Sequence, residues 1–156
     1  MMIETDDPDL KALFAYWTGK CGSRSMPRRA DINPSEIKSL LPLLFIVEIH
    51  QPLRFRFSLV GTAICQRWHE NNTGKWLDEL DYEGGRATVL EQYATVARTG
   101  VPRCDVKEFV GGRGWYLHYW RLLLPLSEDG VTPNLLLGMQ KAIGIEGFKV
   151  GIPKWV

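Results

Sequence analysis

The chain has 156 residues, 45% of them hydrophobic, with 19 basic residues against 18 acidic ones. A chain of this length buries about two-thirds of its unfolded surface, which suffices for one core. The near-zero net charge gives no field that would concentrate the molecule on nucleic acid or an anionic membrane, so neither is an expected partner. No apolar run approaches the ~20 residues of a membrane span, and the acidic N-terminal region lacks the start of a signal peptide, so we expect a cytoplasmic protein.

The cysteines and histidines argue against disulfides and against a zinc site. There are three cysteines, an odd number without paired spacing, and three histidines without metal-ligand spacing. No serine, histidine and aspartate set has a recognisable nucleophile motif. We therefore expect free thiols, no bound metal and no enzymatic activity.

Two helices are predicted near the N-terminus. The first covers 8–21, because Asp7 is a capping residue followed by proline. Its apolar residues recur at helical spacing: Leu10, Leu13, Phe14, Trp17 and Cys21. The second covers 34–41, with Asn33 as its cap and Glu36 in the capping-box position. Three arginines lie between these helices and indicate a solvated loop or a contact for phosphate or an acidic partner: Arg24, Arg28 and Arg29.

The middle of the chain predicts a hairpin and then helices. Strands over 43–49 and 53–60 are joined by a short turn, as in an antiparallel pair. The second strand alternates, and one of its faces is predicted to be buried: Leu53, Phe55, Phe57 and Leu59. Helical segments follow over 62–70, around 76–80 and over 83–99.

Three further strands are predicted over 103–110, 115–126 and 131–140. Glycine-containing turns join them, and glycines between two strands indicate a hairpin rather than a phosphate-binding loop. In the middle strand, Arg121 marks one face as the more exposed one. The other face is apolar: Tyr116, His118, Trp120, Leu122 and Leu124.

The order of two strands, a helical middle and three strands resembles the PAS fold, and in particular a bacterial PAS family. The stretches that carry the likeness span about residues 8–140: Met26 to Ile37 ahead of Leu40–Pro42, Phe55–Phe57 leading to Gly61 and Thr62, Thr73–Lys75, and Leu122–Ser127 before Asp129 and Gly130. The resemblance implies an α+β fold, with a five-stranded antiparallel sheet, helices packed on one face, and an N-terminal helix. It divides the chain into a helix and linker over 1–33, part of the same unit, a PAS-like domain over 34–140, and a C-terminal extension over 141–156 that we expect to pack against the domain or a second subunit.

As to function, the resemblance implies a sensory module that binds a small ligand between sheet and helices and signals through a separate protein. The resemblance does not determine which cofactor, if any, is bound. Proximal-histidine haem is disfavoured because 83–99 contains no histidine, and photoreceptor-type flavin is disfavoured because its cysteine motif is missing. The alternative is a ligand-free module for protein interaction or dimerisation.

Large side chains are the candidates to line the cavity, although each also fits the role of core filler. These candidates are Tyr93, His118, Trp120, Trp68, Trp76 and Trp115. A homodimer is also expected. The candidates for dimer or partner contacts lie on the first helix: Leu10, Phe14 and Trp17.

Overall fold

The computed structural model describes residues 3–82, 85–110 and 116–143. Its α-helices are α1 (Pro8–Cys21), α2 (Thr62–Trp68) and α3 (Arg86–Thr99). Its 3-10 helices are η1 (Arg29–Asp31), η2 (Pro34–Leu43) and η3 (Leu77–Glu79). Its strands are β1 (Leu44–His50), β2 (Arg54–Val60), β3 (Arg103–Val110), β4 (Tyr116–Leu126) and β5 (Leu135–Ala142).

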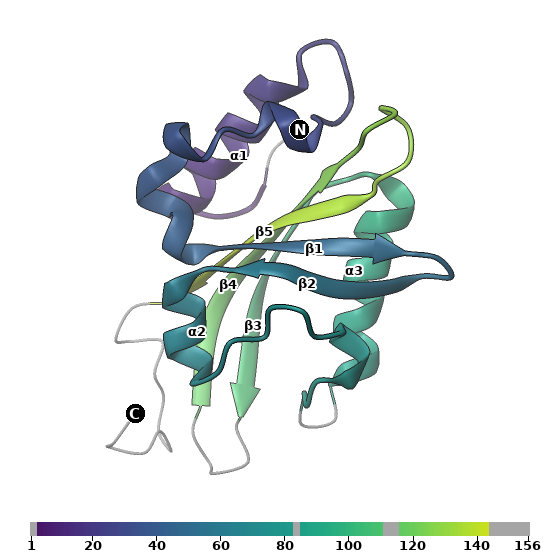
Figure 1. The fold of residues 1–156 in the computed structure, drawn as a ribbon. Coiled ribbons are helices and arrows are strands. Elements are labelled where there is room, and N and C mark those ends of the chain that lie inside the picture. The colour runs from purple at the N-terminus through teal and green to yellow at the C-terminus, as the bar shows by residue number, and fades with distance from the viewer. Residues whose placement is uncertain (1–2, 83–84, 111–115, 144–156) are drawn as a thin grey trace.

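The five strands form one sheet in the order β2-β1-β5-β4-β3, and every neighbouring pair is antiparallel (Figure 1). The two outer hairpins, β1–β2 and β3–β4, are thus joined through β5 in the centre. This arrangement confirms the predicted fold class, an α+β fold with a five-stranded antiparallel sheet.

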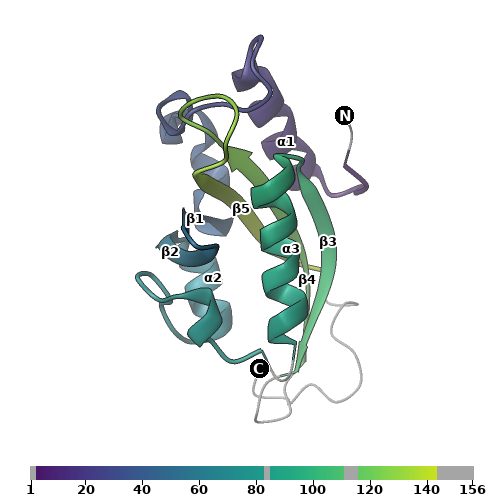
Figure 2. The same ribbon diagram turned by 90° about the vertical axis from the view of Figure 1, so that its right-hand side faces the viewer.

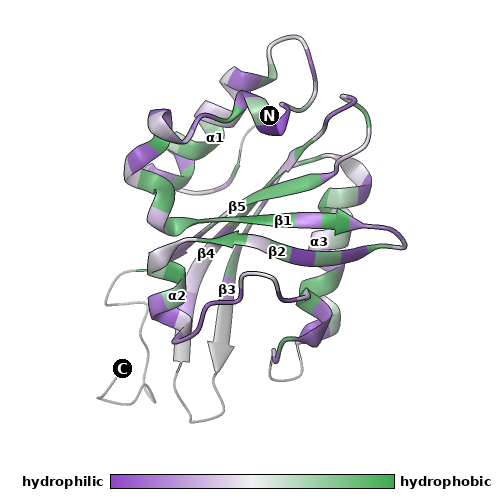
Figure 3. Ribbon diagram, viewed as in Figure 1, coloured by the Kyte–Doolittle hydropathy of each residue, from purple (hydrophilic) through white to green (hydrophobic). Residues whose placement is uncertain are grey.

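Both faces of the sheet carry a core. On the face that we call the outer face, the buried residues of α1 and η2 join those of the sheet: Leu10, Leu13, Trp17, Ile37, Leu40, Leu44, Ile46, Leu122, Leu124, Leu126, Leu137 and Met139. On the inner face, α2, η3 and α3 supply the cover, and α3 runs along β4 (Figure 2). The inner core comprises Phe45, Val47, Phe55, Phe57, Ile64, Leu77, Tyr93, Ala94, Val96, Ala97, Leu123 and Leu136. Because β1 and β5 face apolar side chains on both sides, their ribbons are strongly hydrophobic along most of their length (Figure 3).

The N-terminal helix is fixed to the sheet by polar contacts as well as by apolar packing. As predicted, the Asp7 side chain caps α1, accepting a hydrogen bond from the Asp9 backbone N–H at 2.9 Å. The Lys141 ammonium group of β5 forms ion pairs with the carboxylates of Asp7, at 2.9 Å, and Asp9, at 2.7 Å. At the other end of the helix, Trp17 Nε1 donates to the Pro125 carbonyl of β4 at 2.9 Å. The helix is therefore part of the domain's core.

The predicted buried face of β2 is wrong at one residue. Phe55 and Phe57 are buried as expected, but Leu59 is 44% exposed. The register between β1 and β2 shifts at Ile46 and Val47, where a bulge interrupts the pairing. Because a bulge adds one residue to one strand, side chains beyond it turn to the opposite face.

Two predicted boundaries also differ from the structure. The last strand begins at Leu135 rather than at 131, because the Asp129 side chain accepts hydrogen bonds from the next backbone N–H groups, of Val131 and Thr132, and extends the turn. Around Asn33, the cap is confirmed, but the capping box is wrong: Glu36 accepts a hydrogen bond from the Tyr16 hydroxyl at 2.9 Å instead.

Candidate functional site

A buried arginine occupies the middle of the sheet on the inner face. Arg121 belongs to β4, where Asp105 of β3 is its cross-strand neighbour on one side and Gln140 of β5 on the other. The residue is only 2% exposed. Charged side chains are almost never buried to this extent unless they are paired, so its contacts decide what this position does.

The contacts of Arg121 leave part of its guanidinium group unfilled. Its Nη2 donates to the side-chain oxygen of Gln92 on α3 and lies 3.4 Å from the Asp105 carboxylate. The guanidinium carbon lies 5.2 Å from the centre of the Tyr93 ring, a cation–π distance. Its Nε is buried and has no hydrogen-bond partner among the residues that the structure describes. An unfilled buried donor of this kind costs about 1–3 kcal/mol, and more on a charged group, so it needs an explanation.

A second guanidinium group with an unfilled donor comes from α2. Arg67 has its Nη1 buried without a hydrogen-bond partner in the described part of the chain. Burial lowers the pKa of Arg67, while the nearby hydroxyl of Tyr119 acts in the opposite direction. Burial raises the pKa of Tyr119, and the charges of Arg121 and Arg67 act to lower it.

Tyrosine hydroxyls accompany the two arginines. Tyr93 is 2% exposed and Tyr119 is 8% exposed. Burial raises the pKa of both tyrosines and of Tyr82, an effect that the charge of Arg121 opposes in each case. The three hydroxyl groups therefore keep their protons at neutral pH and can act as hydrogen-bond donors.

Tyr119 is held in place by a tryptophan. The Trp68 ring meets the Tyr119 ring edge-on, with centroids 5.7 Å apart. The Trp68 Nε1 donates to the Gln140 side chain at 2.9 Å, which ties α2 to β5. The two packed rings and this hydrogen bond fix the position of Tyr119 on the α2 side of the site.

Positive charge predominates around the site. Lys107 of β3 donates to Gln92 at 3.1 Å, and Arg103 pairs with Asp105 at 2.5 Å. Burial and the charges of Arg121 and Arg103 lower the pKa of Lys107, which only Asp105 opposes. We refer to Arg67, Tyr93, Asp105, Tyr119 and Arg121 as the inner-face cluster.

Two surface depressions lie along α3, close to the cluster. A groove of about 410 Å³ is lined by Gln92, the residue that also contacts Arg121, and by Ala87, Thr88, Glu91, Thr95 and Arg103. A cleft of about 210 Å³ lies between β2 and α3, and its lining includes Phe55, Leu90, Ala94 and Arg98. The groove brings solvent to the helix side of the cluster.

The structure divides the six predicted cavity residues among different places. Tyr93 and Trp68 lie at the inner-face cluster. Trp120 packs against the outer core, and strand alternation places His118 on that same face. Trp76 lies beside β2, at the edge of the sheet, and the centre of its ring is 4.0 Å from the guanidinium carbon of Arg54. Trp115 lies outside the described residues.

The prediction that Arg121 marks the exposed face of β4 is wrong. The face with His118 and Trp120 is turned to α1, and the face with Arg121 is buried under α3. Sequence reasoning thus missed Arg121, Asp105 and Arg67. One signal was available, since the unbroken apolar run over 122–126 is typical of a strand covered on both faces.

The three residues of α1 that are predicted to make dimer or partner contacts differ in burial. Leu10 is fully buried and Trp17 is 4% exposed, and Phe14 packs against the same core. Phe14 is only half-buried, so the predicted role of this helix in dimer or partner contacts stays a prediction, and it would depend on Phe14 more than on the two buried side chains.

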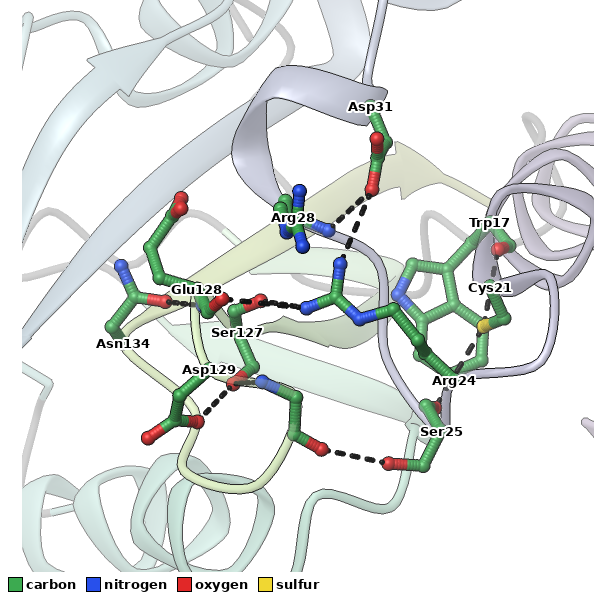
Figure 4. Close-up of polar contacts among 11 residues, drawn as sticks. Trp17, Cys21, Arg24, Ser25, Arg28, Asp31, Ser127, Glu128, Asp129 and Asn134 are labelled. Carbon is green, nitrogen blue, oxygen red and sulfur yellow. Dashed lines mark hydrogen bonds and ion pairs between the residues drawn. The ribbon is translucent and has the colours of Figure 1, made fainter.

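The basic segment after α1 serves the fold. Arg24 donates to the Ser127 carbonyl at 2.9 Å and lies 3.8 Å from the Asp31 carboxylate, while the Ser25 hydroxyl donates to the Gly130 carbonyl at 3.3 Å (Figure 4). These contacts join the loop after α1 to the β4–β5 turn. Arg24 is therefore neither a solvated side chain nor a free contact for phosphate.

The described ranges contain no candidate metal site and no candidate membrane span. Within them no group of three or more histidine, cysteine, aspartate or glutamate side chains could hold a metal ion. None of the helices there has the length and apolar character that a bilayer crossing requires.

A five-stranded antiparallel sheet with helices on both faces, and with polar side chains buried beneath the long helix, defines a small α+β domain. The model of the PAS domain family matches residues 5–141, nearly the whole chain. The chain therefore belongs to the PAS domain family, which confirms the resemblance seen in the sequence. It is a sensory or regulatory module.

Solved structures agree on the fold. The LOV protein of Rhodobacter sphaeroides superposes with a TM-score of 0.54 at 12% identity, covering 74% of this chain and 71% of that one. The PAS domain of Bordetella pertussis BvgS gives 0.52 at 16% identity, covering 70% and 85%. The LOV domain of the blue-light activated histidine kinase EL346 of Erythrobacter litoralis gives 0.52 at 19%, covering 67% and 98%. A search of curated proteins finds no match.

Proposed function

We propose that this PAS domain is a sensor that binds a small ligand at the inner-face cluster, between β4 and α3. The observation that carries the proposal is Arg121, which is buried and yet leaves its Nε without a partner among the described residues. In a core that served folding alone, an apolar side chain here would often be as stable or more stable. A buried charge with an unfilled donor is instead typical of a site that is completed by a bound molecule.

We further propose that the signal passes to a separate protein in the cytoplasm, and that the chain performs no catalysis. Gln92 links the cluster to α3, and α3 lies at the surface beside the groove. A ligand bound at the free Nε of Arg121 would lie beside the contact between Nη2 and Gln92, and its binding can thereby change the position of α3. A partner, or a second copy of the chain in a homodimer, would read such a change at the surface.

A second candidate is a ligand-free interaction module. Aromatic rings fill the inner core towards β1 and β2. The centroid of the Phe45 ring lies 5.8 Å from that of Phe57 and 6.5 Å from that of Tyr93, and the Phe55 and Tyr93 centroids are 5.8 Å apart. Exposed apolar side chains such as Val131, at 79%, are available for contacts between proteins. On this alternative, the cluster is structural and the surface alone carries the function.

Native mass spectrometry of the full chain, combined with scanning fluorimetry against a library of small metabolites, separates the two. The sensor predicts a bound mass or a stabilising compound whose effect is lost in Arg121→Met and kept in Arg28→Met, a matched control at an exposed arginine. The visible absorbance of the same preparation checks for haem and flavin, since some solved neighbours are LOV domains and one was studied with a flavin analogue. A chain that binds nothing in any of these measurements, but captures a partner, would favour the second candidate.

A further inference from the structure

The inner-face cluster carries more positive than negative charge. Among the described residues, four cationic side chains contact or flank it, and one carboxylate lies between them: Arg67, Arg103, Lys107 and Arg121 against Asp105. Like charges that are removed from water repel more strongly than they would at the surface. The arrangement is therefore short of negative charge.

The unfilled hydrogen-bonding capacity has the same character. The two orphaned atoms of the cluster, Arg121 Nε and Arg67 Nη1, are both donors on cations. The hydroxyls of Tyr93 and Tyr119 are donors too, because burial keeps them protonated. What the cluster lacks is an acceptor, and the acceptor that satisfies guanidinium groups best is an oxyanion.

Resting on the proposed ligand site, we propose that the ligand is a small organic carboxylate whose charged group fills the free donor of Arg121, with Arg67 and Tyr119 beside it. The aromatic residues of the inner core occupy the space towards β1 and β2, which keeps the ligand small. Its organic part would lie against the rings of Trp68 and Tyr119. An organic acid is favoured over inorganic phosphate because the rings of Trp68 and Tyr119 offer contacts to its apolar part.

The test uses the full chain and four sets of probes at constant ionic strength. These are the sodium salts of acetate, propionate, succinate and benzoate, the matched neutral amides, inorganic phosphate, and sodium chloride alone. Scanning fluorimetry and titration calorimetry follow binding up to about 10 mM, where even a Kd of 1 mM would register. At least one carboxylate should raise the melting temperature, by ~5–10 °C at a hundredfold excess over its Kd, and its amide should not.

Variants connect the effect to the cluster. Arg121→Met should weaken carboxylate binding at least about tenfold, as expected for the loss of a charge-assisted hydrogen bond, and Arg28→Met should leave it unchanged. Arg67→Met, on a different element, should also weaken it, which keeps the test decisive if Arg121→Met does not fold.

Each other outcome overturns the proposal. If amides or other neutral compounds bind as tightly as the acids, the carboxylate assignment fails while the ligand site stands. If phosphate binds and no carboxylate does, the class is wrong. If no compound binds here and the metabolite library is also silent, the ligand site itself fails.

Discussion

The strongest prediction concerns an asymmetry between two charged neighbours, Arg121 and Asp105. Replacing Arg121 by methionine leaves neither of its partners without a hydrogen bond. Asp105 keeps Arg103 at 2.5 Å, and Gln92 keeps Lys107 at 3.1 Å. Replacing Asp105 by asparagine instead leaves a guanidinium group that is 2% exposed without its carboxylate partner among the described residues.

The expected energies follow from that difference. Removing one partner of a buried ion pair costs about 3–5 kcal/mol, because the other charge stays buried and unpaired. The Asp105 side chain is 21% exposed, so we expect Asp105→Asn to lower the free energy of unfolding by less, about 2–3 kcal/mol. Substituting an apolar residue of similar size for the buried cation is often neutral or stabilising by ~1–4 kcal/mol, so Arg121→Met in the ligand-free protein should change stability between a loss of about 1 and a gain of about 2 kcal/mol.

Urea unfolding followed by tryptophan fluorescence measures both variants, and thermal unfolding checks them at about 2–4 °C per kcal/mol. The double variant should have the same free energy of unfolding as Arg121→Met alone, because Asp105→Asn then leaves no buried cation without its partner. A loss above ~3 kcal/mol in Arg121→Met together with a silent Asp105→Asn would refute the reasoning, since Arg121 would then hold the fold together instead of awaiting a partner.

Three further predictions concern other sites. Gly138→Ala should lower the free energy of unfolding by more than about 2 kcal/mol, because the added carbon would lie 2.0 Å from the fully buried Phe45 ring, whereas Gly19→Ala on α1 meets nothing within 4 Å and should be neutral or stabilising by up to ~1 kcal/mol in the same urea assay. Burial raises the pKa of the Cys104 thiol from 9.0 to about 11, so its alkylation at pH 8 should be about a hundredfold slower than in the unfolded chain. Mass spectrometry measures both rates, and equal rates would contradict this. The contribution of the protonated thiol to stability should be full below pH 9 and should fall as the pH rises towards 11. Backbone N–H groups lower the pKa of Asp129, so its carboxylate should stabilise the turn above the usual value of 3.8 and lose that effect as the pH falls through the lower folded value; an NMR titration with a midpoint at or above 3.8 would disagree.

Local signals predicted most of the fold. The helix cap at Asp7 and the buried positions of Phe55 and Phe57 in β2 each depend on a few neighbouring residues, and each lies where expected. What failed depends on pairing between distant segments. The bulge that exposes Leu59 arises in the pairing of β1 with β2, and no feature of β2 alone announces it.

The candidate site was predicted only in part for a similar reason. Tyr93 and Trp68 were named because large aromatic side chains favour such places. Arg121 was taken as a sign of solvent, because an arginine in a strand is usually exposed. Both faces of β4 carry buried apolar side chains, so its sequence alone does not show which face packs against α3 and which against α1.

The two-sided sheet has a consequence for how the molecule could transmit information. Arg121 and Leu122 are consecutive in β4, yet one belongs to the inner-face cluster and the other to the outer core beneath α1. The planar peptide group between them is rigid, so a strand that adjusts to an occupant on one side must also move the packing on the other. The first helix packs on the outer core that includes Leu122, so a shift of β4 at Arg121 would reach that helix through the sheet.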